Sequence, residues 1–199
     1  TRFRQLLDAD EILVLPGVHD ALSARLAEAA GFSAITCGGY AATASLLGAP
    51  DTAQLSMTEM AELYARLAEA TSLPILADAD TGYGNAVNVA RTVKAFERAG
   101  VAALFMEDQV APKRCGHMDG KRVIPVTEMV AKLKAALDSR EDQDLIIMAR
   151  TDARATEGLE AAIERAQIYR EAGADLIFVE APLTIDEMSR IGEEVPAPC

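Results

Sequence analysis

Acidic side chains gather at the ends of two successive apolar runs in the sequence. Asp78 and Asp80 close one run, and Glu107 and Asp108 close the next. Alternate residues of a strand point to the same face, so Asp78 and Asp80 can share one site. Converging carboxylates repel one another unless a cation neutralises them, and hard divalent cations prefer oxygen ligands. The pattern indicates a Mg²⁺ site, for which Mn²⁺ could substitute. Helix capping by the aspartates is the structural alternative.

A cysteine lies in a cationic stretch, Lys113-Arg114-Cys115-Gly116-His117. Two cations and an imidazole nearby should favour the thiolate form of Cys115. Such a cysteine can donate a proton near neutral pH or act as a nucleophile. The alternative is an inert loop cysteine among solvated charges.

Two further groups are suited to an anionic substrate. Arg150 ends another apolar run, and its guanidinium group matches a carboxylate. An ion pair with Glu180 or Asp152 is the alternative, and both interpretations can hold together. Cys37-Gly38-Gly39 could expose backbone N–H groups to an anion, or could form a plain tight turn.

The elements that must position these residues are short apolar runs separated by helical patterns. The runs are Ile12–Val18, Ala34–Gly39, Pro74–Asp80, Ala103–Gln109, Leu145–Thr151 and Leu176–Pro182. They are mostly continuous rather than alternating, which is typical of strands buried on both faces of a parallel sheet. Helices are expected over 20–30, 57–70, 86–99, 126–137 and 159–172. Strict alternation of strand and helix predicts right-handed parallel crossovers.

Polar residues at the ends of many strands favour a (β/α)8 barrel of the TIM type over an open sheet. A whole barrel takes about 250 residues, and this chain has 199. We therefore expect one domain over residues 1–199 that contains about six βα units and stops before strand seven. No G-x-G-x-x-G motif opens a helix, so a dinucleotide-binding fold lacks its fingerprint.

Charge and cysteine content exclude several classes of function. Nineteen basic against 31 acidic residues give a net charge of −12, which disfavours nucleic acids and anionic membranes as partners. No apolar run approaches the roughly 18 residues that a membrane span needs. Three cysteines without metal-finger spacing predict reduced thiols in a cytoplasmic protein.

These motifs together resemble the isocitrate lyase / phosphoenolpyruvate mutase superfamily. The similarity rests on the Lys-Arg-Cys-Gly-His stretch, Asp78-Ala-Asp80-Thr-Gly-Tyr-Gly, Glu107-Asp108-Gln109 and Ala149-Arg150-Thr-Asp152. It runs from about Leu7 to Glu194. The stretches around Gly38 and Cys115 look most like the branch of 2,3-dimethylmalate lyase, with the 2-methylisocitrate lyases as close neighbours.

The resemblance implies a barrel that swaps its eighth helix in a homodimer or homotetramer. It implies Mg²⁺ held by Asp78, Asp80 and Glu107, partly through water. Cys115 matches the catalytic acid, on a loop that closes over substrate, and Arg150 and His117 are assigned catalytic roles beside it. The residues assigned to the substrate site are Cys37, Gly38, Gly39, Asp51, Gly116, Arg150 and Glu180. Cys37 is a departure, because methylisocitrate lyases usually carry serine there.

The expected activity is Mg²⁺-dependent cleavage of a carbon–carbon bond. The substrate would be a small 2-hydroxy dicarboxylate, a 2-alkylmalate such as 2,3-dimethylmalate, and the products a 2-oxo acid and a carboxylate. The alternatives are a 2-methylisocitrate lyase and an oxaloacetate hydrolase or decarboxylase. A phosphonate mutase and a barrel that binds a dicarboxylate without turnover are further rivals.

Overall fold

The computed structural model describes residues 2–116 and 118–199. Its sheet has five parallel strands in the order β1-β2-β3-β4-β5. The strands are β1 Ile35–Cys37, β2 Ile75–Asp78, β3 Ala103–Glu107, β4 Ile146–Thr151 and β5 Leu176–Val179. The helices are α1 Arg2–Leu7, α2 Ala21–Ala29, α3 Gly39–Leu47, α4 Met57–Ala70, α5 Ala86–Arg98, α6 Val126–Ser139, α7 Ala153–Thr156, α8 Leu159–Glu171 and α9 Ile185–Glu194.

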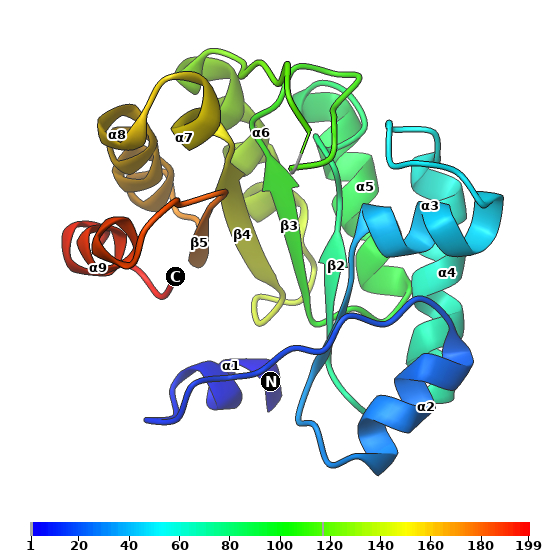
Figure 1. The fold of residues 1–199 in the computed structure, drawn as a ribbon. Helices are drawn as coiled ribbons and strands as arrows, with labels where there is room; N and C mark the ends of the chain where they lie inside the picture. The colour runs from blue at the N-terminus through cyan, green and yellow to red at the C-terminus, as the bar shows by residue number, and fades with distance from the viewer. Residues whose placement is uncertain (1, 117) are drawn as a thin grey trace.

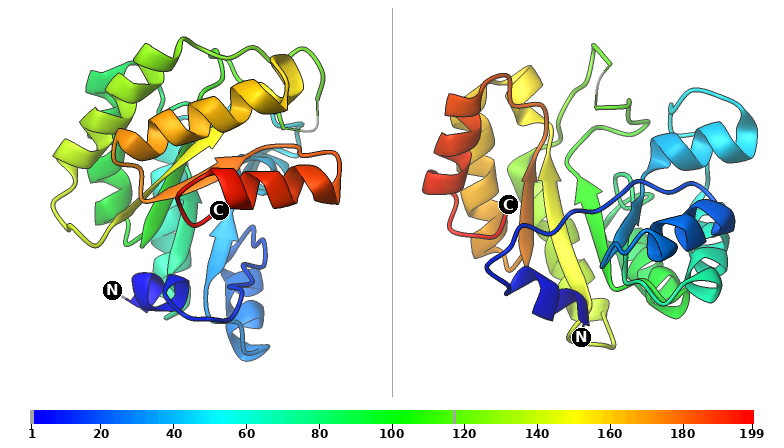
Figure 2. Two further views of the ribbon diagram at one scale, coloured as in Figure 1. Left: turned by 90° about the vertical axis from the view of Figure 1, so that its left-hand side faces the viewer. Right: turned by 60° about the horizontal axis from the view of Figure 1, so that its bottom comes forward.

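Helices alternate with the strands, and neighbouring strands follow one another in sequence, as in a partial barrel (Figure 1). Helices α4, α5, α6 and α8 cover one face of the curved sheet, and α1 lies below its amino-terminal edge (Figures 1 and 2). The predicted α/β architecture is confirmed. Within the described residues, no helix is long and apolar enough to cross a membrane.

The expected strand over Ile12–Val18 is wrong. This segment makes one isolated parallel bridge, between Gly17 and Thr36. Thr36 N donates to the Pro16 carbonyl at 3.1 Å, and Val18 N donates to the Thr36 carbonyl at 2.8 Å. Pro16 has no N–H to extend a ladder, and Ile12 is 90% exposed. The described residues therefore form five strands rather than six, with the segment 16–18 beside β1.

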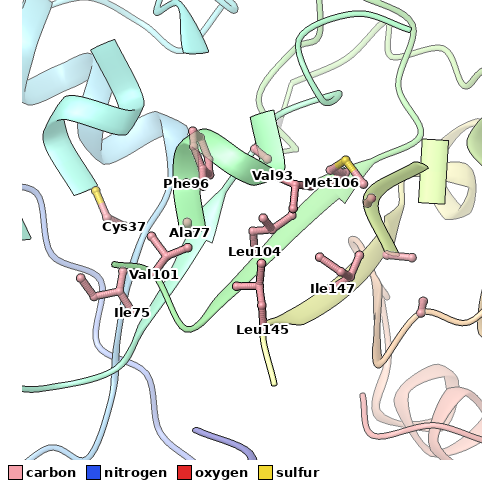
Figure 3. Packing of buried hydrophobic residues seen from close by; sticks show 14 of the residues in the cluster. Cys37, Ile75, Ala77, Val93, Phe96, Val101, Leu104, Met106, Leu145 and Ile147 are labelled. Atoms are coloured by element: carbon pink, nitrogen blue, oxygen red, sulfur yellow. The ribbon is translucent and has the colours of Figure 1, made fainter. Parts of the chain in front are cut away.

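Alternation along each strand divides the apolar residues between two clusters. Odd and even positions face opposite sides of the sheet. The larger cluster fills the space between the sheet and the helices, as Figure 3 shows for Cys37, Ile75, Leu104 and Ile147. The smaller cluster lies on the concave side, where Phe3 of α1 packs. The side chains of the candidate site lie on this concave side, beyond the smaller cluster.

Local sequence signals explain where the helices begin. Capping boxes start three of them, with Asp20, Ser56 and Asn85 as the N-cap residues of α2, α4 and α5. Helix α3 was not expected, because it follows Gly38-Gly39 directly and its glycine N-cap gives no side-chain signal.

Substitution of Phe96 by alanine should destabilise the fold strongly. Phe96 is fully buried in α5 and meets Tyr64 edge-on at 5.0 Å between ring centroids. Large-to-small changes of this kind cost about 3–5 kcal/mol. Val87→Ala, on the same helix but 79% exposed, is the matched control and should change the free energy of unfolding by no more than about 0.5 kcal/mol. Denaturant unfolding measures both, and similar losses would contradict this description of the core.

Candidate functional site

A cavity of about 860 Å³ opens at the carboxyl ends of the strands. Its polar lining comes from the start of α3 and the residue before it, from β2 and β4, from the residue after β5, and from the loops after α3 and β3. These residues are Gly38, Gly39, Asp51, Asp78, Lys113, Cys115, Gly116, Arg150 and Glu180. The structure thus brings together most of the predicted site. His117 lies outside the described residues.

Asp78 lines the cavity and binds the backbone at the ends of two neighbouring strands. Its Oδ2 accepts a 2.7 Å hydrogen bond from Gly39 N, and its Oδ1 accepts one of 2.9 Å from Asp80 N. A Cβ atom on Gly39 would lie 3.2–3.3 Å from Asp78, Asp80 and Lys113 atoms. Position 39 therefore suits glycine because the backbone passes directly against the charged cluster.

Tyr64, from α4, fixes the position of Asp78. Its fully buried hydroxyl accepts a 2.7 Å hydrogen bond from Asp78 N. The carbonyl oxygens of Cys37 and Asp78 lie 2.8 and 3.0 Å away as acceptors for its proton. The Tyr64 hydroxyl thus joins the carboxyl ends of strands β1 and β2.

Asp80 and Asp51 share one buried cation. Lys113 Nζ lies 2.7 Å from Asp51 Oδ2 and 2.9 Å from Asp80 Oδ1. Burial and the Asp78 charge raise the pKa of Asp80 to about 7, against the opposing effect of Lys113. Burial alone would lower the pKa of Lys113, but the Asp80 and Asp78 charges raise it, so this ammonium group stays protonated.

Glu107 lies deeper, at the end of β3. Its carboxylate is buried, and Oε1 has no hydrogen-bond partner among the described residues. Oε2 lies 3.4 Å from Arg150 Nε, across the strand pair that places Glu107 opposite Arg150. Burial raises the pKa of Glu107 well above its ordinary range, and Arg150 opposes this. Such an oxygen is suited to a cation or to water bound to one.

The donor set fits a hydrated Mg²⁺ ion. Among the described residues, no group of three or more His, Cys, Asp or Glu side chains is arranged to hold a metal directly. Mg²⁺ commonly keeps several waters and takes only one or two carboxylates from the protein. Asp78, Asp80 and Glu107 could complete such a shell, partly through water. The capping alternative for Asp80 does not apply to α5, which begins at Asn85.

Arg150 faces the cavity within a carboxylate network. It donates to Asp152 through Nε at 3.0 Å and Nη2 at 3.1 Å. Its Nη2 also lies 3.4 Å from Glu180 Oε2, and the guanidinium carbon lies 5.3 Å from the centre of the Phe178 ring. The predicted ion pairs with Asp152 and Glu180 are present, and Arg150 still lines the cavity.

The loop that carries Cys115 lies against this network. Cys115 is half-buried, and a Cβ atom on Gly116 would collide with Glu180 and Arg150. The neighbouring cations point elsewhere: Lys113 to Asp51 and Asp80, and Arg114 Nη1 to the Asp119 carbonyl at 3.1 Å. The sequence argument supposed that both cations act on the thiol, but these contacts place neither of them there.

Within the Cys37-Gly38-Gly39 stretch, Cys37 takes a different place from the one expected. The Cys37 side chain packs in the helix-facing cluster, where burial raises the pKa of its thiol to about 12. Gly38 is the N-cap residue of α3, and the Gly39 N–H already binds Asp78. Neither position offers a side chain to a substrate, although Gly38 and Gly39 line the cavity.

Two residues that support the site, Tyr64 and Lys121, were not singled out from the sequence, and neither was the hydrogen-bond network that joins Asp108 to Asp152. Asp108 accepts hydrogen bonds from Thr151 Oγ1 at 2.8 Å and from Asp152 N at 2.9 Å. In the sequence alone, Tyr64 is typical of a core residue of a helix, and Lys121 is typical of a solvent-exposed lysine in a loop. Only their burial, 0% and 9% exposed, marks them as different.

A family model, that of phosphoenolpyruvate phosphomutase, matches residues 3–199. The chain belongs to this family. It is 51% identical over 195 residues to a 2,3-dimethylmalate lyase of Eubacterium barkeri, covering 98% of this chain and 68% of that protein. It is 51% identical to the chloroplastic carboxyvinyl-carboxyphosphonate phosphorylmutase of Arabidopsis thaliana, covering 97% and 58%. A 2-methylisocitrate lyase of Bacillus subtilis (strain 168) is 49% identical, with 99% and 64% covered.

Solved structures agree with this assignment. An oxaloacetate acetylhydrolase in complex with 3,3-difluorooxalacetate matches with a TM-score of 0.94 at 38% identity, covering 98% of this chain and 67% of that one. A phosphonopyruvate hydrolase in complex with oxalate and Mg²⁺ matches with a TM-score of 0.89 at 36% identity, covering 98% and 68%. The resemblance seen in the sequence is confirmed. The chain spans about 58–68% of the length of the three curated relatives named above.

Mg²⁺ binding should weaken as the pH falls below about 7. Asp80, with its pKa raised to about 7, must lose its proton to bind a cation. Metal binding therefore competes with that proton, and the affinity should fall about tenfold per pH unit well below pH 7. Calorimetric titration with Mg²⁺ between pH 5.5 and 8 measures this dependence.

The control for this titration is a carboxylate on the surface. Asp119→Asn, at an exposed loop position, should leave the dependence unchanged, whereas Asp80→Asn should remove most of the binding. An affinity that stays constant over this pH range would contradict the role of Asp80.

Proposed function

We propose that this chain carries the active site of a Mg²⁺-dependent carbon–carbon lyase that cleaves a 2-hydroxy dicarboxylate. One observation carries the proposal. One cavity is lined by Asp78, by Arg150, by Cys115 and by Lys113, which pairs with Asp80. Cleavage needs three parts: a cation site for the hydroxy acid, a charged clamp for a carboxylate, and an acid for the carbanion.

The chain's own residues supply the second and third parts. When the C2–C3 bond of the substrate breaks, its electron pair remains on C3 and C2 becomes a ketone. Arg150, held at the cavity by Asp152 and Glu180, would bind a carboxylate and stabilise the enolate charge that develops on it. Cys115 Sγ would donate its proton to C3. The hydroxyl proton passes to a general base.

The first requirement, a cation site for the hydroxy acid, would be met by a cation bound at Asp78, Asp80 and Glu107. Bound there, Mg²⁺ would polarise the 2-hydroxy acid and lower the pKa of its hydroxyl. The orphaned Glu107 oxygen and the raised pKa of Asp80 support this assignment, because both groups gain from a nearby cation. The same cation offsets the repulsion between a dianionic substrate and a chain of net charge −12.

The substrate class is a 2-alkylmalate, and 2,3-dimethylmalate is the first compound to test. A tricarboxylate such as 2-methylisocitrate needs one more cationic or N–H group for its third carboxylate. Lys113 is already paired with Asp51 and Asp80, and Gly39 N with Asp78. Arg150 and the metal site suffice for two carboxylates. We further propose that the enzyme works as a homo-oligomer in the cytoplasm, with neither nucleic acid nor membrane as a partner.

Release of the 2-oxo acid from 2,3-dimethylmalate and 2-methylisocitrate tests the substrate class. With a coupled lactate dehydrogenase assay at equal substrate concentrations, kcat/KM should be at least tenfold higher for the dicarboxylate, or about 1.4 kcal/mol of transition-state preference. The reverse preference would favour a methylisocitrate lyase. Oxaloacetate and a phosphonate complete the panel, because the relatives include an acetylhydrolase and a mutase. Turnover of the phosphonate alone would overturn the lyase proposal.

Cys115→Ser should abolish most turnover while substrate binding remains. A serine hydroxyl is far less acidic than a thiol, so proton donation to C3 should become slow. We expect kcat to fall by more than a hundredfold, about 2.7 kcal/mol in activation free energy, with KM changed less than threefold. Cys37→Ser, in the core away from the cavity, is the control and should keep its rate per folded molecule. A Cys115→Ser enzyme with more than a tenth of the normal kcat would contradict this role.

A further inference from the structure

Lys121 is a buried loop lysine that contacts both sides of the candidate site. Its side chain is 4% exposed. Nζ donates a 2.7 Å hydrogen bond to the Gly116 carbonyl, within the loop after β3. It also lies 2.9 Å from Asp152 Oδ1, at the end of β4. One ammonium group therefore joins the loop to the sheet.

Each of these two partners is next to a group with a proposed chemical role. Gly116 follows Cys115 directly in the chain. Asp152 accepts two hydrogen bonds from Arg150. The backbone N–H of Asp152 in turn donates to the Asp108 carboxylate. Lys121 and Asp152 thus connect the Gly116 carbonyl to the guanidinium group of Arg150, in addition to the direct packing of Gly116 against Arg150. Ion pairs buried to this degree are costly to break on one side only.

The base of the loop is held by other contacts. The side-chain amide of Gln109 binds both backbone groups of Arg114, at 2.9 and 3.0 Å. Gln109 also bridges to Val123 in antiparallel fashion, with Val110 N donating to the Arg122 carbonyl at 2.8 Å. These contacts do not involve the Lys121 side chain. Its loss should therefore remove the bond between the Gly116 carbonyl and β4, and loosen the loop there, without unfolding the loop base.

We propose that Lys121 is a positioning residue that holds Cys115 against the cavity and fixes its place relative to Arg150. The catalytic meaning of this contact rests on the proposed lyase function. The contact itself does not, because it can be measured without substrate. Lys121 would thus act on the reaction through the Gly116 carbonyl and Asp152, and not by touching the reacting atoms.

Alkylation of Cys115 tests the contact directly. Lys121→Met keeps the length of the side chain and removes its N–H donors. Arg122→Met removes the same charge from the next residue, which is exposed, and is the matched control. The protein is treated with iodoacetamide, and the rate of modification at Cys115 is followed by peptide mass spectrometry.

We expect Cys115 to react at least threefold faster in Lys121→Met than in the unchanged protein, with Arg122→Met within a factor of 1.5. Removal of a positive charge does not by itself make a thiol more reactive toward iodoacetamide. An increase therefore reports freed access rather than charge. An unchanged or slower rate in Lys121→Met would overturn the proposal.

Two additional measurements separate this proposal from a general loss of structure and from failure of the lyase assignment. Thermal unfolding shows whether Lys121→Met folds. If it does not fold, the Lys121→Arg variant is used instead, because arginine keeps the positive charge and the N–H donors. In folded Lys121→Arg protein, Cys115 must be alkylated at the normal rate. Where the unchanged enzyme has lyase activity, Lys121→Met should lower kcat at least tenfold with KM changed less than threefold. Faster alkylation in an enzyme that lacks lyase activity would support the contact and refute only the function.

Discussion

The carboxyl edge of the sheet buries more negative than positive charge, and this imbalance constrains the whole site. Apart from the Asp108–Arg165 pair, six acidic side chains are buried there beside three basic ones: Asp51, Asp78, Asp80, Glu107, Asp152 and Glu180 against Lys113, Lys121 and Arg150. Buried charge is costly unless it is paired and hydrogen-bonded. The structure responds with shared cations, with backbone N–H donors to Asp78, and with raised pKa values at Asp80 and Glu107. A divalent cation would supply the remaining positive charge.

The three basic residues divide the edge into two halves. Lys113 serves the half on β2, where Asp51 and Asp80 share it. Arg150 and Lys121 serve the half on β4, where both bind Asp152. Glu107 stands between the halves, opposite Arg150 in the strand register. A substrate that bridges a cation and Arg150 would span both halves, which suits a dicarboxylate better than a monocarboxylate.

The apolar runs predicted from the sequence contain all five strands of the sheet, but they extend past the strand ends by up to three residues, at β5. Asp78, Glu107 and Arg150 each end a continuous apolar run, and all three lie on the concave side. The alternation of side chains along a strand places Cys37 on the helix side, and its inclusion in the site came from proximity to Gly38 in the chain. The segment around Pro16 resembled a strand by composition, but proline cannot donate to a ladder. Lys121 could not be found, because its partners at Gly116 and Asp152 meet only when the loop folds back onto β4.

Lys113 shows that a charged residue close to Cys115 in the sequence need not direct its charge at the thiol. In the sequence it stands two residues from Cys115, and a thiolate-stabilising role follows naturally. In the structure its ammonium group is bound to Asp51 and Asp80. These contacts place the Lys113 charge in the carboxylate cluster, so closeness in the sequence does not by itself assign that charge to the thiol of Cys115.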